Sequence, residues 1–308
     1  MAGQAAGDMA GGTPPRKAAS SSLPITAPEV RARKGSGRPL VMVTAYDAPS
    51  ARVASDAGVD VILVGDSVAM VVLGYDDTLQ VTTADMAHHV AAVARARPKP
   101  LVVGDLPWLS YHVSREETVR NAATLVRAGA AAVKLEGGRK RLDAVRAILD
   151  TEIPVMGHLG LTPQSIHALG GFKVQGKQLD AARVIVDDAV VLAEAGCFAI
   201  VLECVPDGVA RMVTDAVPVP TIGIGAGRHC DGQVLVYHDL LGLEERVMPR
   251  FVRRYADLKA EATAAVARFA ADVRSGRFPS SGETYHMTDR MAEALDLYGD
   301  HREQVLPG

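Results

Sequence analysis

About eight short, continuously apolar segments run through the sequence, and stretches with a helical spacing of apolar residues separate most of them. Strands that are apolar on both faces are typical of a parallel sheet covered by helices. Eight such strands alternating with helices predict an α/β fold closed into a (β/α)8 TIM barrel, more readily than an open sheet. The candidate strands are residues 39–45, 59–65, 100–104, 131–136, 154–157, 197–203, 220–224 and 233–237.

Local signals mark where several helices begin and end. Ser114 and Glu117 form an S-x-x-E capping box at the start of one helix, and Gly129 ends the same helix. The pair Thr162 and Pro163 is typical of an N-cap followed by a proline at the first helical position. Only about eight residues separate the last two strands, so a loop is expected there. A helix across about 250–273 is expected to close the barrel.

Length, charge and cysteine content limit the organisation and the partners of the chain. We expect a disordered extension over residues 1–24, a barrel domain over 25–275 and a C-terminal tail over 276–308. The formal net charge is −3 and no basic stripe stands out, so nucleic acid is not an expected partner. No segment reaches eighteen apolar residues, so no membrane span is expected. Three cysteines without zinc-ligand spacing favour a reduced, cytoplasmic setting.

Four acidic residues fall at the carboxyl ends of four candidate strands: Asp66, Asp105, Glu136 and Glu203. In a barrel these ends meet at one mouth, where active sites are built. Each acid alone could be a helix cap, but four crowded carboxylates would repel one another. A hard divalent cation such as Mg²⁺ would relieve the repulsion, and we assign Asp66, Asp105 and Glu136 to it. Glu203 comes from a strand well around the barrel, which suits a general base facing the metal across a substrate.

Three further polar residues lie beside these acids. Lys134 is two residues before Glu136, so strand alternation points both toward one face, where a cation would stabilise an enolate. Pairing with a carboxylate and a Schiff-base role are the alternatives for this lysine. Ser67 could bind a substrate carboxylate through its hydroxyl and its backbone N–H. His158 ends the fifth strand and could contact substrate or metal-bound water, or make a structural hydrogen bond.

Eight motifs, in this order over roughly residues 25–270, resemble the ketopantoate hydroxymethyltransferase family. They are VTAYD at 43–47, VGDS at 64–67, GDLPW at 104–108, VKLEGG at 133–138, GHLGLTPQS at 157–165, GGFKVQGK at 170–177, LECVP at 202–206 and GIGAG at 223–227. One such motif would be a weak signal, whereas the ordered series is highly specific. The extension before and the tail after the motifs are not covered by the resemblance.

The resemblance implies a barrel of the phosphoenolpyruvate/pyruvate-binding type and a homodecameric assembly. It implies transfer of a hydroxymethyl group from 5,10-methylenetetrahydrofolate to 3-methyl-2-oxobutanoate, giving 2-dehydropantoate for pantothenate and coenzyme A biosynthesis. The implied roles are substrate binding by Asp66, Ser67, Asp105 and Lys134, Mg²⁺ binding by Asp66, Asp105 and Glu136, and proton abstraction by Glu203. The expected intermediate is an enolate of the oxoacid, stabilised by the metal and by Lys134.

Two other interpretations remain open at the level of sequence. A metal-dependent 2-oxoacid lyase or mutase would share the barrel and the enolate chemistry, although the cysteine-bearing loop motif of those enzymes is absent. A catalytically inactive barrel that serves as a binding protein is the second alternative. Four acids retained at four strand ends argue against it, because an inactive site has no need of charges that repel one another.

Overall fold

The computed structural model describes residues 23–244 and 248–295, which form two compact units. The first unit runs to Tyr237 and includes Pro249–Val252; the second contains the remaining described residues from His238 onward. The predicted extension over 1–24 lies almost entirely outside the described residues, as does part of the predicted tail over 276–308. The boundaries predicted for the barrel domain, 25–275, stay a prediction.

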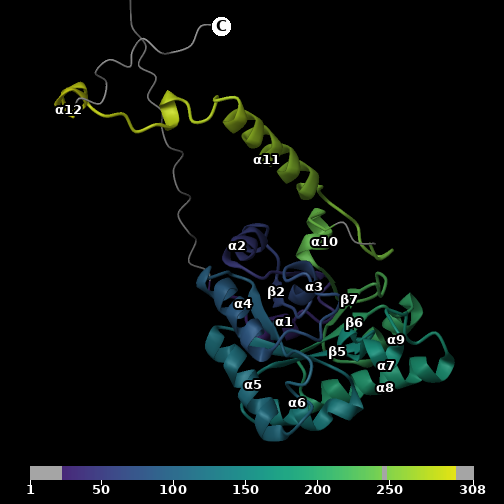
Figure 1. Ribbon diagram of the computed structural model, residues 1–308. Coiled ribbons are helices and arrows are strands. Elements are labelled where there is room, and N and C mark those ends of the chain that lie inside the picture. The colour runs from purple at the N-terminus through teal and green to yellow at the C-terminus, as the bar shows by residue number, and fades with distance from the viewer. Residues whose placement is uncertain (1–22, 245–247, 296–308) are drawn as a thin grey trace, which may run out of the picture. The chain divides into compact units, whose positions relative to one another are not determined.

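Eight parallel strands form a closed barrel in the first unit, in the order in which they occur along the chain (Figure 1). The barrel closes through β8 and β1, where Leu40 pairs with Gly232 and Val43 with Leu235. The predicted fold class and all eight predicted strands are therefore confirmed. The strands are β1 (Leu40–Thr44), β2 (Val61–Val64), β3 (Leu101–Asp105), β4 (Ala132–Glu136), β5 (Val155–Gly160), β6 (Ala199–Glu203), β7 (Thr221–Ile224) and β8 (Gly232–Leu235).

Most helices of the first unit cover the outside of this barrel (Figure 1), whereas Ala27 and Val30 of the first helix pack with the residues that fill its inside. The helices follow in chain order. They are α1 (Ala27–Arg31), α2 (Ala48–Asp56), α3 (Val68–Val71), α4 (Thr83–Arg95), α5 (Arg115–Ala128), α6 (Leu142–Leu149), α7 (Ile166–Leu169), α8 (Leu179–Ala195) and α9 (Asp207–Ala216), with the 3-10 turns η1 (Arg139–Arg141) and η2 (Pro163–Ser165). The Ser114 hydroxyl caps α5 by accepting from the Glu117 N–H at 3.1 Å, and Gly129 ends it with φ +115°. Residues 225–231 contain no helix, as predicted for the last connection.

The helix expected near 250–273 begins later, because Asp257 caps it: α11 spans Leu258–Arg274. It belongs to the second unit, with α12 (Asp289–Ala294), the 3-10 turn η3 (Ser281–Glu283) and most of α10 (Tyr237–Leu241). The predicted role of this helix in closing the barrel was wrong, because pairing of β8 with β1 closes it. No helix among residues 23–244 and 248–295 is long and apolar enough to cross a membrane.

Side chains alternate along each strand between two apolar layers. Inward positions fill the barrel with residues such as Leu101, Val103, Ala132 and Met156, whereas outward positions such as Ile62 pack with the helices. Along β4 the inward series continues from Ala132 to Lys134 and Glu136. The inside of the barrel is thus apolar in its lower layers and becomes charged toward the carboxyl ends of the strands.

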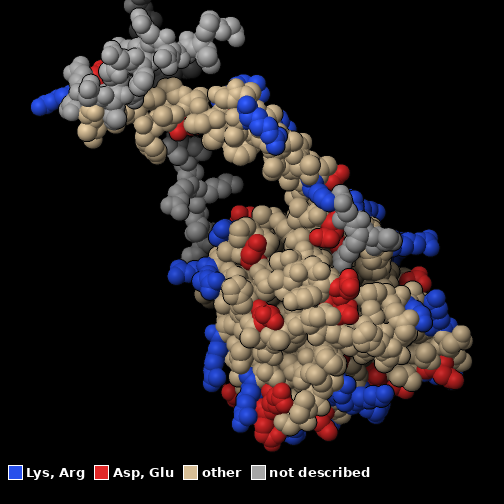
Figure 2. Space-filling view, viewed as in Figure 1, with Lys and Arg blue, Asp and Glu red and all other residues tan. Residues whose placement is uncertain are grey.

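Basic and acidic side chains are mixed over the helices of the first unit on the face shown in Figure 2. Some of them form exposed ion pairs, such as Arg115 with Asp150 at 3.1 Å. Such pairs contribute little to folding, since water screens both partners. The charges that bear on function are the buried ones at the barrel mouth.

Candidate active site

The carboxyl ends of β2 to β5 bring together five of the predicted site residues in a buried cluster: Asp66, Asp105, Lys134, Glu136 and His158. Each is at most 5% exposed. Asp105, Lys134, Glu136 and His158 are on the strands themselves, and Asp66 follows β2 by two residues. The positions of the four strand residues follow from strand alternation, which continues the inward series past the apolar layers. Burial of so many ionisable groups in one place is typical of a functional site.

Lys134 is the buried lysine of this cluster. Its Nζ lies 2.9 Å from Asp105 Oδ1 and 4.0 Å from Glu136 Oε1. Burial alone would lower the pKa of Lys134, but the carboxylates of Asp105 and Glu136 outweigh it and raise that pKa above its usual value. The ammonium group is therefore charged at neutral pH. A protonated lysine in this position is suited to stabilising negative charge on a substrate oxygen, and is a poor amine nucleophile.

Asp66 and Asp105 lie against each other, with the Asp66 N–H donating to Asp105 Oδ2 at 3.2 Å. Burial, followed by the negative charges of Asp105 and Glu136, raises the pKa of Asp66 well above its usual value. Burial also raises the pKa of Asp105, although Lys134 opposes the shift. The repulsion expected from the sequence is thus present, because one lysine does not balance these carboxylates.

His158 connects the cluster to Glu203. Its Nδ1 lies 3.4 Å from Glu136 Oε1, and its Nε2 lies 3.2 Å from Glu203 Oε2. Burial and Lys134 act to lower the pKa of His158, but the carboxylates of Glu136 and Glu203 raise it to about 9. The ring is therefore an imidazolium that joins two acids from β4 and β6. These contacts with Glu136 and Glu203 fit the second alternative for His158, a structural hydrogen bond, whereas contact with substrate or metal-bound water stays a prediction.

Glu203 is the most open of these acids, with 17% of its side chain exposed, against 2% for Asp105 and Glu136. It ends β6, and the next residue, Cys204, has a left-handed backbone with φ +47°. The Cys204 N–H donates to Ile224 O, which fixes this conformation. Such strained residues concentrate at functional sites. A partly exposed carboxylate at the mouth of the barrel can be reached by a substrate proton.

Ser67 lies at the start of α3, and its hydroxyl is 2.9 Å from the hydroxyl of Tyr46. The serine is half-buried, next to Asp66 in the chain. Tyr46 follows β1 and was not predicted as a site residue, although it lies within the VTAYD motif. The two hydroxyls form a polar pair beside the carboxylate cluster.

Two other polar side chains were missed from the sequence. Gln164 and Tyr111 are buried, and the Tyr111 hydroxyl contacts Gln164 Oε1 at 2.5 Å. The amide of Gln164 in turn donates to Asp66 Oδ2 at 2.9 Å. Both residues lie on loops after strands, so alternation could not place them. The signal that pointed to Gln164 was its position in the GLTPQS motif.

The donor set fits an open site for a hard divalent ion rather than a closed cage. Among the described residues, no group of three or more His, Cys, Asp or Glu side chains is arranged to hold a metal. Asp105 Oδ1 and Glu136 Oε1 are nevertheless buried, and Lys134 Nζ lies 2.9 Å from the first and 4.0 Å from the second. Mg²⁺ commonly uses one or two protein carboxylates and completes its coordination with water and substrate oxygens. The crowded carboxylates meet that requirement.

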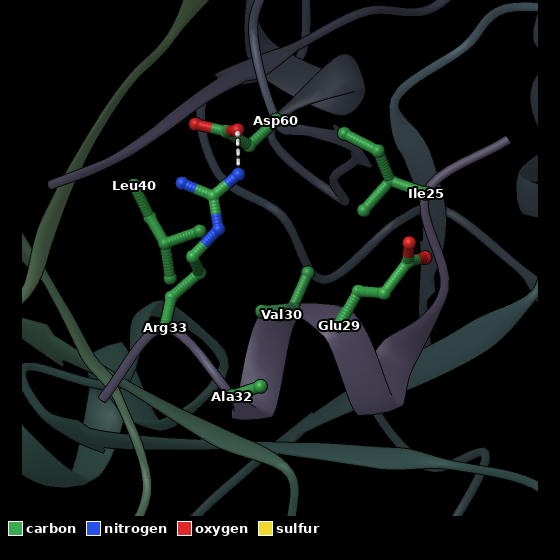
Figure 3. Close-up of a pocket in the computed structure, with 7 residues that line it drawn as sticks. All are labelled: Ile25, Glu29, Val30, Ala32, Arg33, Leu40 and Asp60. Carbon is green, nitrogen blue, oxygen red and sulfur yellow. Dashed lines mark ion pairs between the residues drawn. The ribbon is translucent and has the colours of Figure 1, made fainter. Parts of the chain in front are cut away.

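A separate cavity of about 350 Å³ lies at the opposite end of the strands, since Leu40 begins β1 and Asp60 precedes β2 (Figure 3). Two of its lining residues form an ion pair, with Arg33 Nη2 at 3.5 Å from Asp60 Oδ1. The other Asp60 oxygen accepts from the Val41 N–H at 2.9 Å. The amino-terminal end of a barrel is the end that serves stability. The cavity is lined by Ile25, Glu29, Val30, Ala32, Arg33, Leu40 and Asp60.

Comparison with known proteins finds a match to the model of the family described as "Ketopantoate hydroxymethyltransferase", over residues 24–281. The 3-methyl-2-oxobutanoate hydroxymethyltransferase 2 of Bradyrhizobium diazoefficiens is 54% identical over 271 residues, 88% of this chain and 92% of that protein. A 3-methyl-2-oxobutanoate hydroxymethyltransferase from Ignicoccus hospitalis is 57% identical over 258 residues, which cover 84% of this chain and 98% of that one.

Solved structures with the same fold share much less sequence. A phosphonopyruvate hydrolase in complex with oxalate and Mg++ superimposes with a TM-score of 0.53 at 15% identity, covering 88% of this chain and 95% of that one. A phosphoenolpyruvate phosphomutase from Streptomyces platensis subsp. rosaceus gives a TM-score of 0.53 at 16% identity, with 88% and 96% covered. These structures support the barrel architecture alone.

Proposed function

This chain belongs to the ketopantoate hydroxymethyltransferase family, and we propose that it transfers a hydroxymethyl group to 3-methyl-2-oxobutanoate to give 2-dehydropantoate. The support is the family match over residues 24–281 and relatives of that name at 54% and 57% identity. The structural observation behind the proposal is the buried cluster of acids with one lysine at the mouth of the barrel. The lyase or mutase alternative has only the shared fold in its favour, at 15% and 16% identity.

Asp66, Asp105 and Glu136 would hold the divalent metal, and their oxygen donors favour Mg²⁺. When bound, this ion supplies positive charge beside the keto and carboxylate oxygens of the 2-oxoacid and so acidifies the C3 proton. The hydroxyl of Ser67 would bind the substrate carboxylate, and the hydroxyl of Tyr46, 2.9 Å away, would orient it. Lys134, already ionised, contributes a second positive charge toward the keto oxygen.

Glu203 is the proposed base. Its carboxylate accepts the proton from C3, and the electron pair of the broken C–H bond passes into the enolate of the oxoacid. The imidazolium of His158, 3.2 Å from Glu203 Oε2, holds the carboxylate in position before the transfer. The carbon nucleophile then forms the new carbon–carbon bond with a one-carbon unit at the oxidation level of formaldehyde, which water releases from its folate carrier together with tetrahydrofolate. The oxygen that water supplied takes up a proton and becomes the hydroxyl group of the product. We propose 5,10-methylenetetrahydrofolate as the donor of that unit.

Product formation tests this function directly. The purified chain is incubated with 3-methyl-2-oxobutanoate, with and without methylenetetrahydrofolate, in the presence of Mg²⁺, Mn²⁺, Co²⁺ or Zn²⁺. We expect 2-dehydropantoate only when both the folate and a divalent ion are present. Cleavage of a 2-oxoacid without folate would instead support the lyase alternative. We also propose a cytoplasmic homodecamer, which sedimentation of the purified chain would test.

A further inference from the structure

Gln164 touches two of the proposed metal-binding carboxylates at once. It lies in the 3-10 turn η2 that follows β5, and it is 5% exposed. Its side-chain amide donates to Asp66 Oδ2 at 2.9 Å, and its backbone N–H donates to Glu136 Oε2 at 3.1 Å. Asp66 follows β2 and Glu136 ends β4, so this residue links acids from two non-adjacent strands.

The orientation of the Gln164 amide is set by its neighbours. The Tyr111 hydroxyl accepts the Glu136 N–H at 3.2 Å and donates to Gln164 Oε1 at 2.5 Å, which is much nearer than its other acceptor, Glu136 O at 3.4 Å. The second amide proton is donated to Leu106 O at 3.0 Å. A flipped amide would place Oε1 against two acceptor oxygens, those of Asp66 and Leu106, and its NH₂ group against the hydroxyl proton of Tyr111. Only one orientation therefore satisfies every partner.

The same loop also reaches the proposed base. The Leu161 N–H donates to Glu203 O at 2.8 Å, three residues before Gln164. Ser165 N–H donates to Thr162 O at 2.8 Å and closes the turn that carries Gln164. One short segment thus contacts the acids assigned to the metal and the backbone of the acid assigned to proton transfer.

We propose that Gln164 is a positioning residue that holds one oxygen of Asp66 and one oxygen of Glu136, with its amide oriented by Tyr111. This inference rests on the proposed function, because it takes those two acids as metal ligands. While Gln164 holds Glu136 Oε2, Glu136 Oε1 lies 3.4 Å from His158 Nδ1 and 4.0 Å from Lys134 Nζ. Gln164 therefore fixes one Glu136 oxygen and leaves the other turned toward the buried side chains of the cluster.

The test compares Mn²⁺ binding by the full chain and its variants, followed by the electron paramagnetic resonance signal of the free ion. Gln164→Met keeps the length of the side chain but removes every amide contact. We expect Mn²⁺ binding about 10–100-fold weaker, the usual effect of removing a group that orients metal ligands. Tyr111→Phe removes one hydroxyl and should weaken binding about two- to tenfold. Gln178→Met, at an exposed N-cap glutamine whose side chain makes no capping bond, should bind like the parent.

Each outcome decides the matter. Mn²⁺ affinity within twofold of the parent in folded Gln164→Met would overturn the positioning role while leaving the metal site intact. Absence of Mn²⁺ binding by the parent would overturn the metal site itself, and the role of Gln164 with it. If circular dichroism shows that Gln164→Met does not fold, Tyr111→Phe decides: weakened binding supports the proposal, and parental affinity overturns it.

Discussion

Replacing Lys134 with methionine removes the ammonium group from the buried cluster and keeps a side chain of similar length. The ammonium lies 2.9 Å from Asp105 and 4.0 Å from Glu136, and the three side chains are 2–3% exposed. At 4 Å and an effective dielectric constant of about 20, one such attraction amounts to about 4 kcal/mol before desolvation is counted. Removal of one partner from a buried pair lowers the free energy of unfolding by about 3–5 kcal/mol.

Thermal unfolding in the presence of EDTA measures this loss without a metal contribution. A loss of about 3–5 kcal/mol corresponds to a Tm lower by about 6–20 °C. The matched control is Arg115→Met, which breaks an ion pair of 3.1 Å whose side chains are 56% and 69% exposed. Such a pair is worth at most about 1 kcal/mol, so the control should change Tm by only a few degrees.

The pH dependence of the same variant has a definite sign. Burial raises the pKa of Asp66 and of Asp105, and Lys134 opposes both shifts, so the variant should raise both pKa values further. An acid whose pKa is higher in the folded state than in the unfolded state binds more protons when folded. The folded state therefore loses stability as pH rises from the unfolded pKa to the folded pKa. The Tm deficit of Lys134→Met should therefore shrink between pH 7.5 and pH 5.5. A Tm within 2 °C of the parent at pH 7.5, or a deficit that grows on acidification, would refute this reasoning.

Three further variants test the surroundings of Glu203. His158→Asn removes the imidazolium beside Glu203, and steady-state kinetics should show kcat lower by about 10–100-fold; an unchanged kcat would contradict its role. Gly160→Ala places a methyl group against the backbone oxygen of Glu203, at a residue with φ +92°. Urea unfolding should show a free energy of unfolding lower by about 1–3 kcal/mol, and parental stability would argue against the contact. Cys204→Gly should keep kcat within about twofold of the parent. It should lower the free energy of unfolding by less than about 1 kcal/mol, because glycine adopts φ +47° without strain. A larger loss of stability would show that the thiol itself contributes to folding.

The placement of the acids could be predicted because two regularities determine it. Parallel strands bring their carboxyl ends to one mouth, and alternation decides which side chains point inward. Asp105, Lys134, Glu136 and His158 are strand residues and obey both rules. Their burial and mutual contacts follow from the strand assignment alone.

The rest of the site depends on loop geometry, which no periodicity records. Thr162 and Pro163 do start a helical turn, but it is the three-residue η2, followed by the short α7, and the Thr162 side chain makes no capping bond. That turn is what brings Gln164 under the acids. Tyr111 likewise comes from the loop between β3 and α5. Polar residues of this kind are identified only when the path of the backbone is known.

The helix predicted near 250–273 shows another limit of prediction from the sequence. A helix that closes the barrel was predicted near 250–273, and α11 exists, but the sequence did not reveal that it belongs to a second compact unit. Closure of a barrel requires only that the last strand pair with the first, and β8 does so along four residues of β1. Strand pairing, which helical periodicity does not report, was the deciding interaction.

Proton removal from C3 of 3-methyl-2-oxobutanoate tests the central claim most directly. In D₂O with Mg²⁺ and without folate, the parent chain should exchange the C3 proton, as followed by nuclear magnetic resonance. Glu203→Gln should slow this exchange by at least about 100-fold, the smallest effect usual for loss of a general base. Glu194→Gln, at an exposed position of α8, should exchange like the parent. Exchange at the parental rate in Glu203→Gln would contradict the assignment of the base.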